Sequence, residues 1–249
     1  MDVLIIENFL DRIKQIIINT IQHEKIIIPF SGGVDSTFLA ILCNNLHYDV
    51  TLLTIGFKNC HDVLFAKKIS NMIKLPHKIY EINNDDEFNY IKHNIKNEIV
   101  TDSLSWLENC IAFYYMSKAS QKFGFDVIVT ANGIDELFCG YDIYRRIGSH
   151  NNTKLLQMID TKLKNEINML DKAHFISSQF HIRFIHPFLF CDFIKIAKQI
   201  PLSYKIRDGN DFLRKHIIRT LALEIGAPKI SAYKRKKSMQ YGSRIHKFI

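Results

Sequence analysis

The chain has 249 residues, of which 47% are hydrophobic, so it can bury one sizeable core, and no low-complexity linker divides it. Its formal net charge of +8 permits a nucleic-acid partner but is equally consistent with a site for a polyanionic nucleotide. No apolar run approaches the roughly 18 residues of a membrane span, which excludes an integral membrane protein of the helical class.

Strand-like and helical segments alternate along the first half of the chain. The helical segments expected from apolar spacing cover 7–22, a stretch that starts at 36, 61–73 and 85–123, and the strands cover 26–30, 50–57, 77–82 and 126–130. Such alternation predicts an α/β fold with a doubly wound parallel sheet. The aromatic residues 113–115 lie within the last helical region, and we expect them in the core rather than on a base-stacking platform.

A glycine turn follows the first strand and opens the next helix. The turn has the sequence Ser31, Gly32, Gly33, Val34, Asp35 and Ser36. Its backbone N–H groups, its serine hydroxyls and the positive end of the helix dipole predict a cradle for phosphate or pyrophosphate. It is not a G-x-x-x-x-G-K-[ST] loop, because no Lys precedes Ser36. Asp35 would repel a phosphate unless a divalent cation lay between them, so its carboxylate predicts Mg²⁺.

A second motif, Ala131 to Tyr141, directly follows the strand predicted at 126–130. The carboxyl ends of parallel strands meet at one edge of a sheet, so Asp135 is expected on the same edge as Asp35. Two carboxylates, completed by triphosphate oxygens and water, make a reasonable Mg²⁺ site. Alternatively, Asp135 and Glu136 are acids that stabilise a helix N-terminus through its dipole.

Together, the two motifs resemble one enzyme family. S-G-G-V-D-S resembles the pyrophosphatase loop of the ATP-pyrophosphate-cleaving ligases, and G-I-D-E-L-F-C-G-Y resembles the second signature of asparagine synthetase and its relatives, including the β-lactam and carbapenam synthetases. The resemblance runs from about Lys25 to the C-terminus and is looser between Arg145 and Tyr204. It implies a sheet of the ATP-pyrophosphatase, or adenine nucleotide α-hydrolase-like, type. It also implies one domain over 1–249, with an N-terminal helix (1–24), a nucleotide-binding core (25–148) and a mainly helical acceptor- and phosphate-facing part (149–249).

The resemblance also implies a reaction and a set of site residues. Enzymes of this family use ATP and Mg²⁺ to adenylate a carboxylate with release of pyrophosphate, after which an amine attacks and AMP leaves. By similarity, Asp35 and Asp135 would hold the metal, and residues 212–219 would form a helix on which Lys215 touches phosphate. Lys237 would hold the α-phosphate and stabilise the transition state. Lys236 could exchange roles with Lys237, and a solvated basic tail is the alternative for this region. The residues expected beside the adenine are Phe30, Ile55, Thr130 and Ala131.

Three departures from the family pattern leave the acceptor and the amine open. The chain begins Met1-Asp2 without a glutaminase nucleophile, so we expect free ammonia, another amine or a separate glutaminase partner to supply nitrogen. Asn132 stands where asparagine synthetase has a Glu that assists ammonia, and an amide cannot act as a general base. In the segment His181 to Phe190, Arg183 stands where the family has a Glu and would suit an anionic acceptor, and Phe190 replaces an Asp after the P-F-L sequence. His186 is a further candidate base, with a structural histidine as the alternative.

These observations predict an amide ligase with small-molecule carboxylate and amine substrates. Asparagine made from aspartate is the first candidate product; the alternatives are a different carboxylate, such as a specialised metabolite or modified nucleoside, and a non-catalytic nucleotide-binding regulator. The five cysteines are widely spaced without a C-x-x-C pair, and Asp2 and Glu7 interrupt the region where a signal peptide would be basic and then apolar. We therefore expect reduced, mostly buried thiols and a cytoplasmic location.

Overall fold

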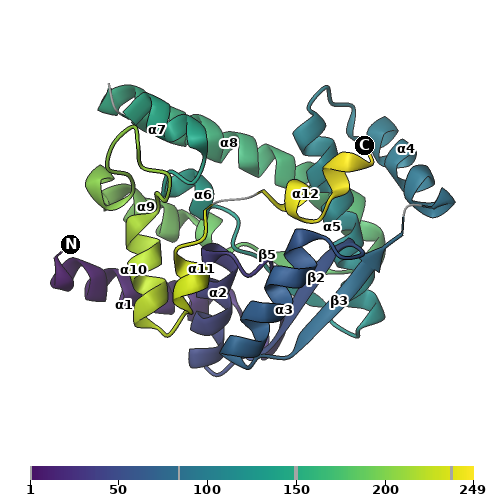
Figure 1. Ribbon diagram of the computed structural model, residues 1–249, viewed down its shortest axis with the longest axis horizontal. Helices are drawn as coiled ribbons and strands as arrows, with labels where there is room; N and C mark the ends of the chain where they lie inside the picture. Colours follow the sequence, from purple (N-terminus) through teal and green to yellow (C-terminus); the bar gives the residue numbers. More distant parts are fainter. Residues whose placement is uncertain (1, 84, 149–150, 236–237) are drawn as a thin grey trace.

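The computed structural model describes residues 2–83, 85–148, 151–235 and 238–249. Its strands form a five-stranded sheet in the order β3-β2-β1-β4-β5, and every neighbouring pair is parallel (Figure 1). The strands are β1 (Lys25–Pro29), β2 (Asp49–Phe57), β3 (His77–Ile82), β4 (Val127–Val129) and β5 (Arg183–Ile185). Helices connect the strands, so the predicted α/β fold with a doubly wound parallel sheet is confirmed.

The helices account for most of the remaining chain. The α-helices of the described residues are α1 (Val3–Thr20), α2 (Val34–Asn45), α3 (His61–Ile73), α4 (Asp86–Ile99), α5 (Leu104–Lys122), α6 (Ile134–Leu137), α7 (Asp142–Gly148), α8 (Asn152–Ser177), α9 (Cys191–Gln199), α10 (His216–Glu224), α11 (Lys229–Ala232) and α12 (Met239–Gly242). Short 3₁₀ turns are η1 (Ser178–Phe180), η2 (Pro187–Leu189), η3 (Leu202–Tyr204) and η4 (Ile245–Lys247).

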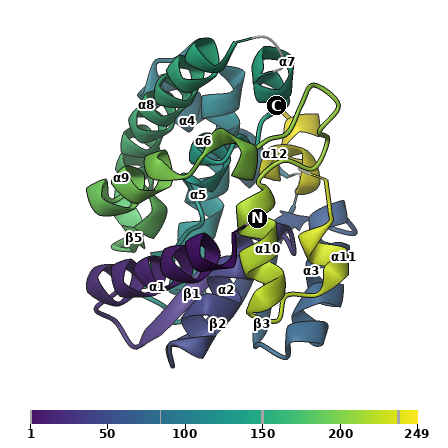
Figure 2. The same ribbon diagram turned by 90° about the vertical axis from the view of Figure 1, so that its left-hand side faces the viewer.

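The central strands are apolar on both faces because helices cover both. Ile26 and Ile28 of β1 pack into one hydrophobic core, which includes residues of α1, α2, α9 and α10. Ile27 points to the opposite face and packs into a second core with α4, α5 and α8. Side chains alternate along a strand, so an uninterrupted apolar run is what a strand covered on both faces requires. Figure 2 shows α1 and α10 on one side of the sheet and α5 on the other.

Two details of the predicted elements were wrong. The helical region expected over 85–123 is two helices, because Val100 adopts a positive φ of 42° after α4 and Ser103 caps α5 by accepting a hydrogen bond from the Trp106 N–H. Strand β5 was not expected, since its three residues are too few to show a period. Of the aromatic residues expected in the core, Phe113 and Tyr115 are buried there, and Tyr114 is partly buried and packs against it.

The structure also describes the cysteines and the apolar character of the helices. All five cysteines are free thiols, and four of them are buried, with Cys191 as the exposed one. Among the residues that the structure describes, none of the helices has both the length and the apolar character that crossing a membrane requires.

The strand order determines where along the carboxyl edge of the sheet a ligand can bind. Strand β1 lies between β2 and β4: from β1 the chain continues to its neighbour β2 on one side, and from β4 it continues to β5 on the other side. In open α/β sheets, ligands bind outside the carboxyl ends of the strands at such a switch point. The loops after β1 and β4 carry the two motifs found in the sequence.

Candidate active site

A cavity of about 470 Å³ opens at the carboxyl ends of β1, β2 and β4. Eleven of the residues predicted from the sequence line it: Phe30, Ser31, Gly33, Val34, Asp35, Ser36, Ile55, Thr130, Ala131, Asp135 and Lys215. Of the other two, Gly32 lies behind the loop, and Lys237 lies outside the described residues, as does Lys236, its alternative. Residues distant in sequence therefore meet around one hollow at the switch point.

Gly32 shapes the loop from behind rather than lining the cavity. Its φ is +72°, and a Cβ at this position would lie 2.8 Å from the Phe65 ring, so only glycine fits. Ser231 of α11 donates its hydroxyl hydrogen to the Gly32 carbonyl at 2.7 Å. Helix α2 begins at Val34, directly after the turn, so its positive end faces the cavity. The loop is thus held from two sides in a form suited to an anion.

The predicted metal-binding carboxylates converge on one ammonium group. The Lys215 Nζ donates to Asp35 Oδ2 at 2.6 Å and to Asp135 Oδ1 at 2.9 Å, and the Lys215 side chain is only 1% exposed. The remaining Asp35 oxygen, Oδ1, is buried and has no hydrogen-bond partner among the described residues. This orphaned oxygen fits a cation ligand, because an unpaired buried acceptor otherwise costs free energy.

Magnesium suits this donor set. The described part of the chain contains no group of three or more His, Cys, Asp or Glu side chains that could enclose a metal. Mg²⁺ typically takes one or two carboxylates and completes its shell with water and substrate phosphates. Asp35 and Asp135 are therefore the residues that would hold Mg²⁺ here.

The backbone that presents Lys215 is strained and firmly held. Arg214 and Lys215 both adopt positive φ values, 50° and 53°, each of which costs about 1–3 kcal/mol. The buried Asp211 carboxylate accepts the Arg214 N–H at 2.9 Å, and the Arg214 guanidinium donates twice to the Gly140 carbonyl, at 3.0 and 3.2 Å. The helix expected over 212–219 accordingly begins only at His216, with Lys215 at its N-cap. Strain of this kind directs the ammonium toward the two carboxylates.

Gly140 fits against the carboxylate of Asp135. A Cβ on Gly140 would lie 1.8 Å from Asp135 Oδ1, which is far inside van der Waals contact. Any side chain at 140 would push Asp135 away from Lys215. The glycine of the second motif is therefore part of the carboxylate arrangement.

The cavity has a cationic wall formed by Arg219, Lys234 and Arg235, none of which was assigned a site role from the sequence. Arg219 is buried and donates to the carbonyls of Leu213, Arg214, Ala232 and Lys234, which joins the start of α10 to the segment after α11. An Arg four residues after Lys215, on the same helical face, was a usable signal. With Lys215, these groups supply positive charge around the cavity.

An acidic group lies at the α8 side of the cavity, and sequence reasoning missed most of it. Glu136 is buried, accepts hydrogen bonds from the Gly133 N–H and the Tyr141 hydroxyl, and has a pKa raised to about 8 by burial and by the charges of Glu166 and Asp135. Glu166 of α8 accepts a hydrogen bond of 2.6 Å from the Asn132 amide. The sequence did contain a signal for Glu166: a charged residue occupies one of the positions that are otherwise apolar along the buried face of this helix.

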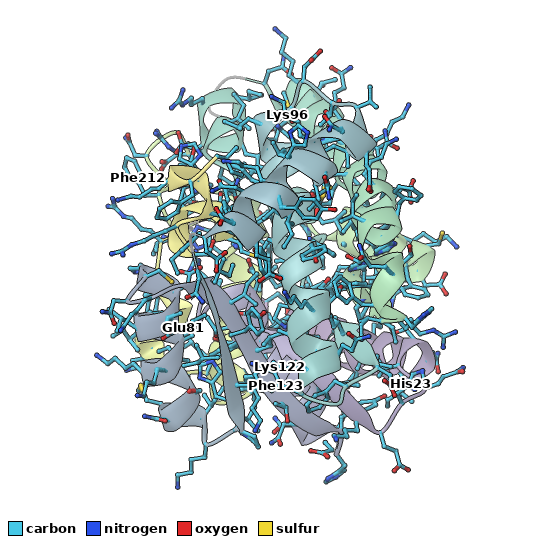
Figure 3. The ribbon with its side chains drawn as sticks, turned by 90° about the vertical axis from the view of Figure 1, so that its right-hand side faces the viewer. His23, Glu81, Lys96, Lys122, Phe123 and Phe212 are labelled. Carbon is cyan, nitrogen blue, oxygen red and sulfur yellow. The ribbon has the colours of Figure 1, made fainter. Side chains whose placement is uncertain are left out.

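The two residues offered as acceptor-handling groups do not line this cavity. Arg183 is exposed on β5, and its Nη1 lies 3.2 Å from His23 Nε2, at the edge of the molecule where Figure 3 labels His23. His186 is buried, with Nδ1 2.5 Å from the Thr130 hydroxyl and Nε2 2.8 Å from His174 Nε2. Burial lowers the pKa of His186 to about 3, so the ring is neutral and structural. The structure thus places neither Arg183 nor His186 in this cavity, and it agrees with the alternative that His186 is a structural histidine.

Comparisons with known proteins agree with the motifs. The asparagine synthase family model matches residues 19–174, which is more than half of the chain. A putative glutamine-hydrolyzing asparagine synthetase of Methanocaldococcus jannaschii is 26% identical over 98% of this chain and 50% of its own length. An asparagine synthetase domain-containing protein of Drosophila melanogaster is 22% identical over 90% of this chain and 45% of its own length.

The chain thus spans about half the length of these curated relatives. Among solved structures, a U34-tRNA thiolase NcsA from Methanococcus maripaludis, with its 4Fe-4S cluster, matches with a TM-score of 0.45 and 13% identity, over 97% of this chain and 72% of the other. The family model and the cavity both include the loop after β1 and the loop after β4. The chain belongs to the asparagine synthase family.

Proposed function

We propose that this protein is an ATP-dependent amide ligase. In the proposed reaction, a substrate carboxylate oxygen attacks the α-phosphorus of ATP and pyrophosphate leaves. An amine then attacks the acyl carbon, a carbon–nitrogen bond forms, and AMP leaves with the electron pair of the broken carbon–oxygen bond. The observation that carries the proposal is the convergence of Asp35 and Asp135 on Lys215 beside the Ser31–Ser36 turn. Aspartate is the first candidate acceptor.

The residues around the cavity support specific roles in the first step. The turn after β1 and the N-terminus of α2 would bind the departing pyrophosphate through backbone N–H groups. Lys215 and the cationic wall would offset the negative charge that accumulates on the phosphates in the transition state. Mg²⁺ held by Asp35 and Asp135 would neutralise further phosphate charge. Lys237 is proposed to hold the α-phosphate, as the family resemblance implies.

The deciding experiment measures AMP and pyrophosphate released from Mg-ATP, with aspartate and ammonium each present or omitted. We expect both products to require aspartate and to disappear in Asp35→Ala. Asp49→Ala is the matched control, because Asp49 is an exposed aspartate at the opposite, amino-terminal end of β2. Product formation that is unchanged in Asp35→Ala would contradict the proposal.

A second candidate keeps the reaction and changes the acceptor. Asn132 in place of the family Glu, and Phe190 in place of an Asp after the P-F-L sequence, favour a carboxylate other than aspartate. AMP release that is indifferent to aspartate but responds to another carboxylate would select this candidate. A separate glutaminase as the nitrogen source is proposed for either acceptor.

A further inference from the structure

The ammonium of Lys215 occupies carboxylate oxygens of the two residues that would hold the metal. Its Nζ bridges Asp35 Oδ2, at 2.6 Å, and Asp135 Oδ1, at 2.9 Å. All three side chains are largely shielded from water, with 1% of Lys215, 18% of Asp35 and 13% of Asp135 exposed. Charges interact strongly at close range where water is mostly excluded. A metal ion that binds these carboxylates therefore has to compete with an ammonium.

The charges of the site oppose a free divalent cation. Two carboxylates and one ammonium leave little negative charge, and Arg219, Lys234 and Arg235 add positive charge to the lining of the cavity. A divalent ion on the carboxylates would also repel the Lys215 ammonium beside it. Mg²⁺ is usually bound through one or two carboxylates together with substrate phosphates. The negative charge that can hold both cations is therefore that of the triphosphate.

The backbone around Lys215 is fixed, whereas its side chain can turn. Arg214 and Lys215 adopt positive φ values of 50° and 53°, and the Arg214 guanidinium donates to the Gly140 carbonyl. The ammonium of a lysine lies at the end of a flexible stem, and Lys215 lines the same cavity as Ser31 and Ser36 of the phosphate loop. Its ammonium can therefore exchange a carboxylate partner for a phosphate without a change in the fold.

The Asp35 carboxylate keeps an acceptor that the ammonium does not use. Oδ2 receives the Lys215 ammonium, whereas Oδ1 is buried and has no hydrogen-bond partner among the described residues. A buried acceptor without a partner costs free energy, which a cation at this oxygen would recover. The pair of carboxylates is thus better satisfied by a metal ion than by the ammonium, provided that the ammonium has another anion to bind.

We infer that Lys215 is an exchangeable counter-ion of the metal site and makes metal binding depend on the nucleotide; this rests on the proposed ligase function. Lys215 holds Asp35 and Asp135 in place until the metal–nucleotide complex enters the cavity. The phosphates then attract the ammonium, and the carboxylates become available to the metal. Free metal is bound weakly because of the ammonium. By reciprocity, nucleotide without metal is also bound weakly, since its phosphates would face two carboxylates.

The test measures the binding of Mn²⁺, as the probe for Mg²⁺, in the absence of nucleotide. Electron paramagnetic resonance of unbound Mn²⁺ gives the Kd. We expect a millimolar Kd for the natural protein and a Kd about tenfold lower or better for Lys215→Met. Lys162→Met is the matched control and should resemble the natural protein. It removes one positive charge from the lining of the same cavity, but the Lys162 ammonium lies 5.7 Å from the centre of the Tyr141 ring.

The natural protein gives a second readout that needs no substitution. Calorimetric titration with α,β-methylene ATP, whose α–β bond cannot be cleaved, should show binding about tenfold tighter or more in Mg²⁺ than in EDTA. Micromolar binding of Mn²⁺ alone to the natural protein would overturn the role of Lys215, and so would equal Mn²⁺ affinities in Lys215→Met and Lys162→Met. Either result leaves the ligase proposal intact. Failure of the nucleotide to bind in both solutions would overturn the ATP-dependent function, and this inference with it.

Discussion

The ammonium of Lys215 lies 2.6 Å from the carboxylate of Asp35, although 180 residues separate the two along the chain. The same ammonium also reaches Asp135, so one buried cation joins the phosphate loop, the loop after β4 and the start of α10. Three distant segments are thereby joined at the switch point of the sheet.

Lys215→Met is expected to destabilise the protein by about 3 kcal/mol, because removal of one partner leaves two carboxylates facing each other without a counter-charge. Added Mg²⁺ should recover part of this loss, since a divalent cation can replace the ammonium between Asp35 and Asp135. Urea unfolding with and without Mg²⁺ measures both effects. Lys229→Met, at an exposed lysine of α11, is the control, and equal destabilisation by the two variants would contradict the prediction.

Gly140→Ala is expected to abolish ATP-dependent product formation, because the new Cβ would overlap Asp135 Oδ1. The accompanying overpacking should cost about 1–3 kcal/mol of stability. Gly124→Ala is the control: its φ of +73° makes alanine unfavourable by about 1 kcal/mol, but no atom lies within 4 Å of its Cβ. Steady-state rates and urea midpoints should show that both variants lose stability and only Gly140→Ala loses activity.

Acid should destabilise the fold through His186. Its folded pKa is lowered to about 3 by burial, whereas the unfolded value is near 6.5, so the unfolded chain binds the extra proton between these values. Stability is therefore fully present above about pH 6.5 and falls by up to about 1.4 kcal/mol per pH unit as the pH decreases toward 3.

His186→Gln should flatten this dependence in urea unfolding at a series of pH values. Part of the slope should remain, because burial also lowers the pKa of His77 to about 4. His93→Gln, at an exposed histidine of α4, should leave the slope unchanged. A slope that is the same in His186→Gln and the natural protein would show that His186 does not titrate in this way.

The C-terminal segment should loosen in Glu108→Gln. The buried Glu108 of α5 pairs with His246, and the segment that this contact holds includes Met239 and Gln240, which line the cavity beside α5 (Figure 1). We expect faster tryptic cleavage after Arg244 and a several-fold higher KM for ATP. Glu98→Gln, an exposed acid of α4, is the control, and unchanged cleavage in Glu108→Gln would rule out this contact as the restraint.

Several structural features of this protein could be predicted from its sequence, because they depend on neighbouring residues. The apolar run from Ile26 to Phe30 predicted a strand, because a strand that is covered on both faces consists almost entirely of apolar residues. The positive φ of Gly32 and the helix start at Val34 follow from the same short stretch, since a tight turn and a helix N-terminus depend on neighbouring residues. The expectation that Asp35 and Asp135 share a sheet edge needed only parallel strands.

Other features depend on contacts between segments that no local pattern links. The helix predicted over 212–219 begins only at His216, because the Arg214 side chain donates to the Gly140 carbonyl and Asp211 accepts the Arg214 N–H. These contacts override the helical pattern of residues 212–215. His186 reads as a candidate base in sequence, but its burial against Thr130 and His174 makes it structural. Glu166 becomes part of the cavity only because α8 crosses the loop that carries Asn132. The sequence by itself determined four of the five strands, the phosphate turn and the family. The charges that face one another across the cavity were decided by tertiary packing, because distance in space, not along the chain, sets their interaction.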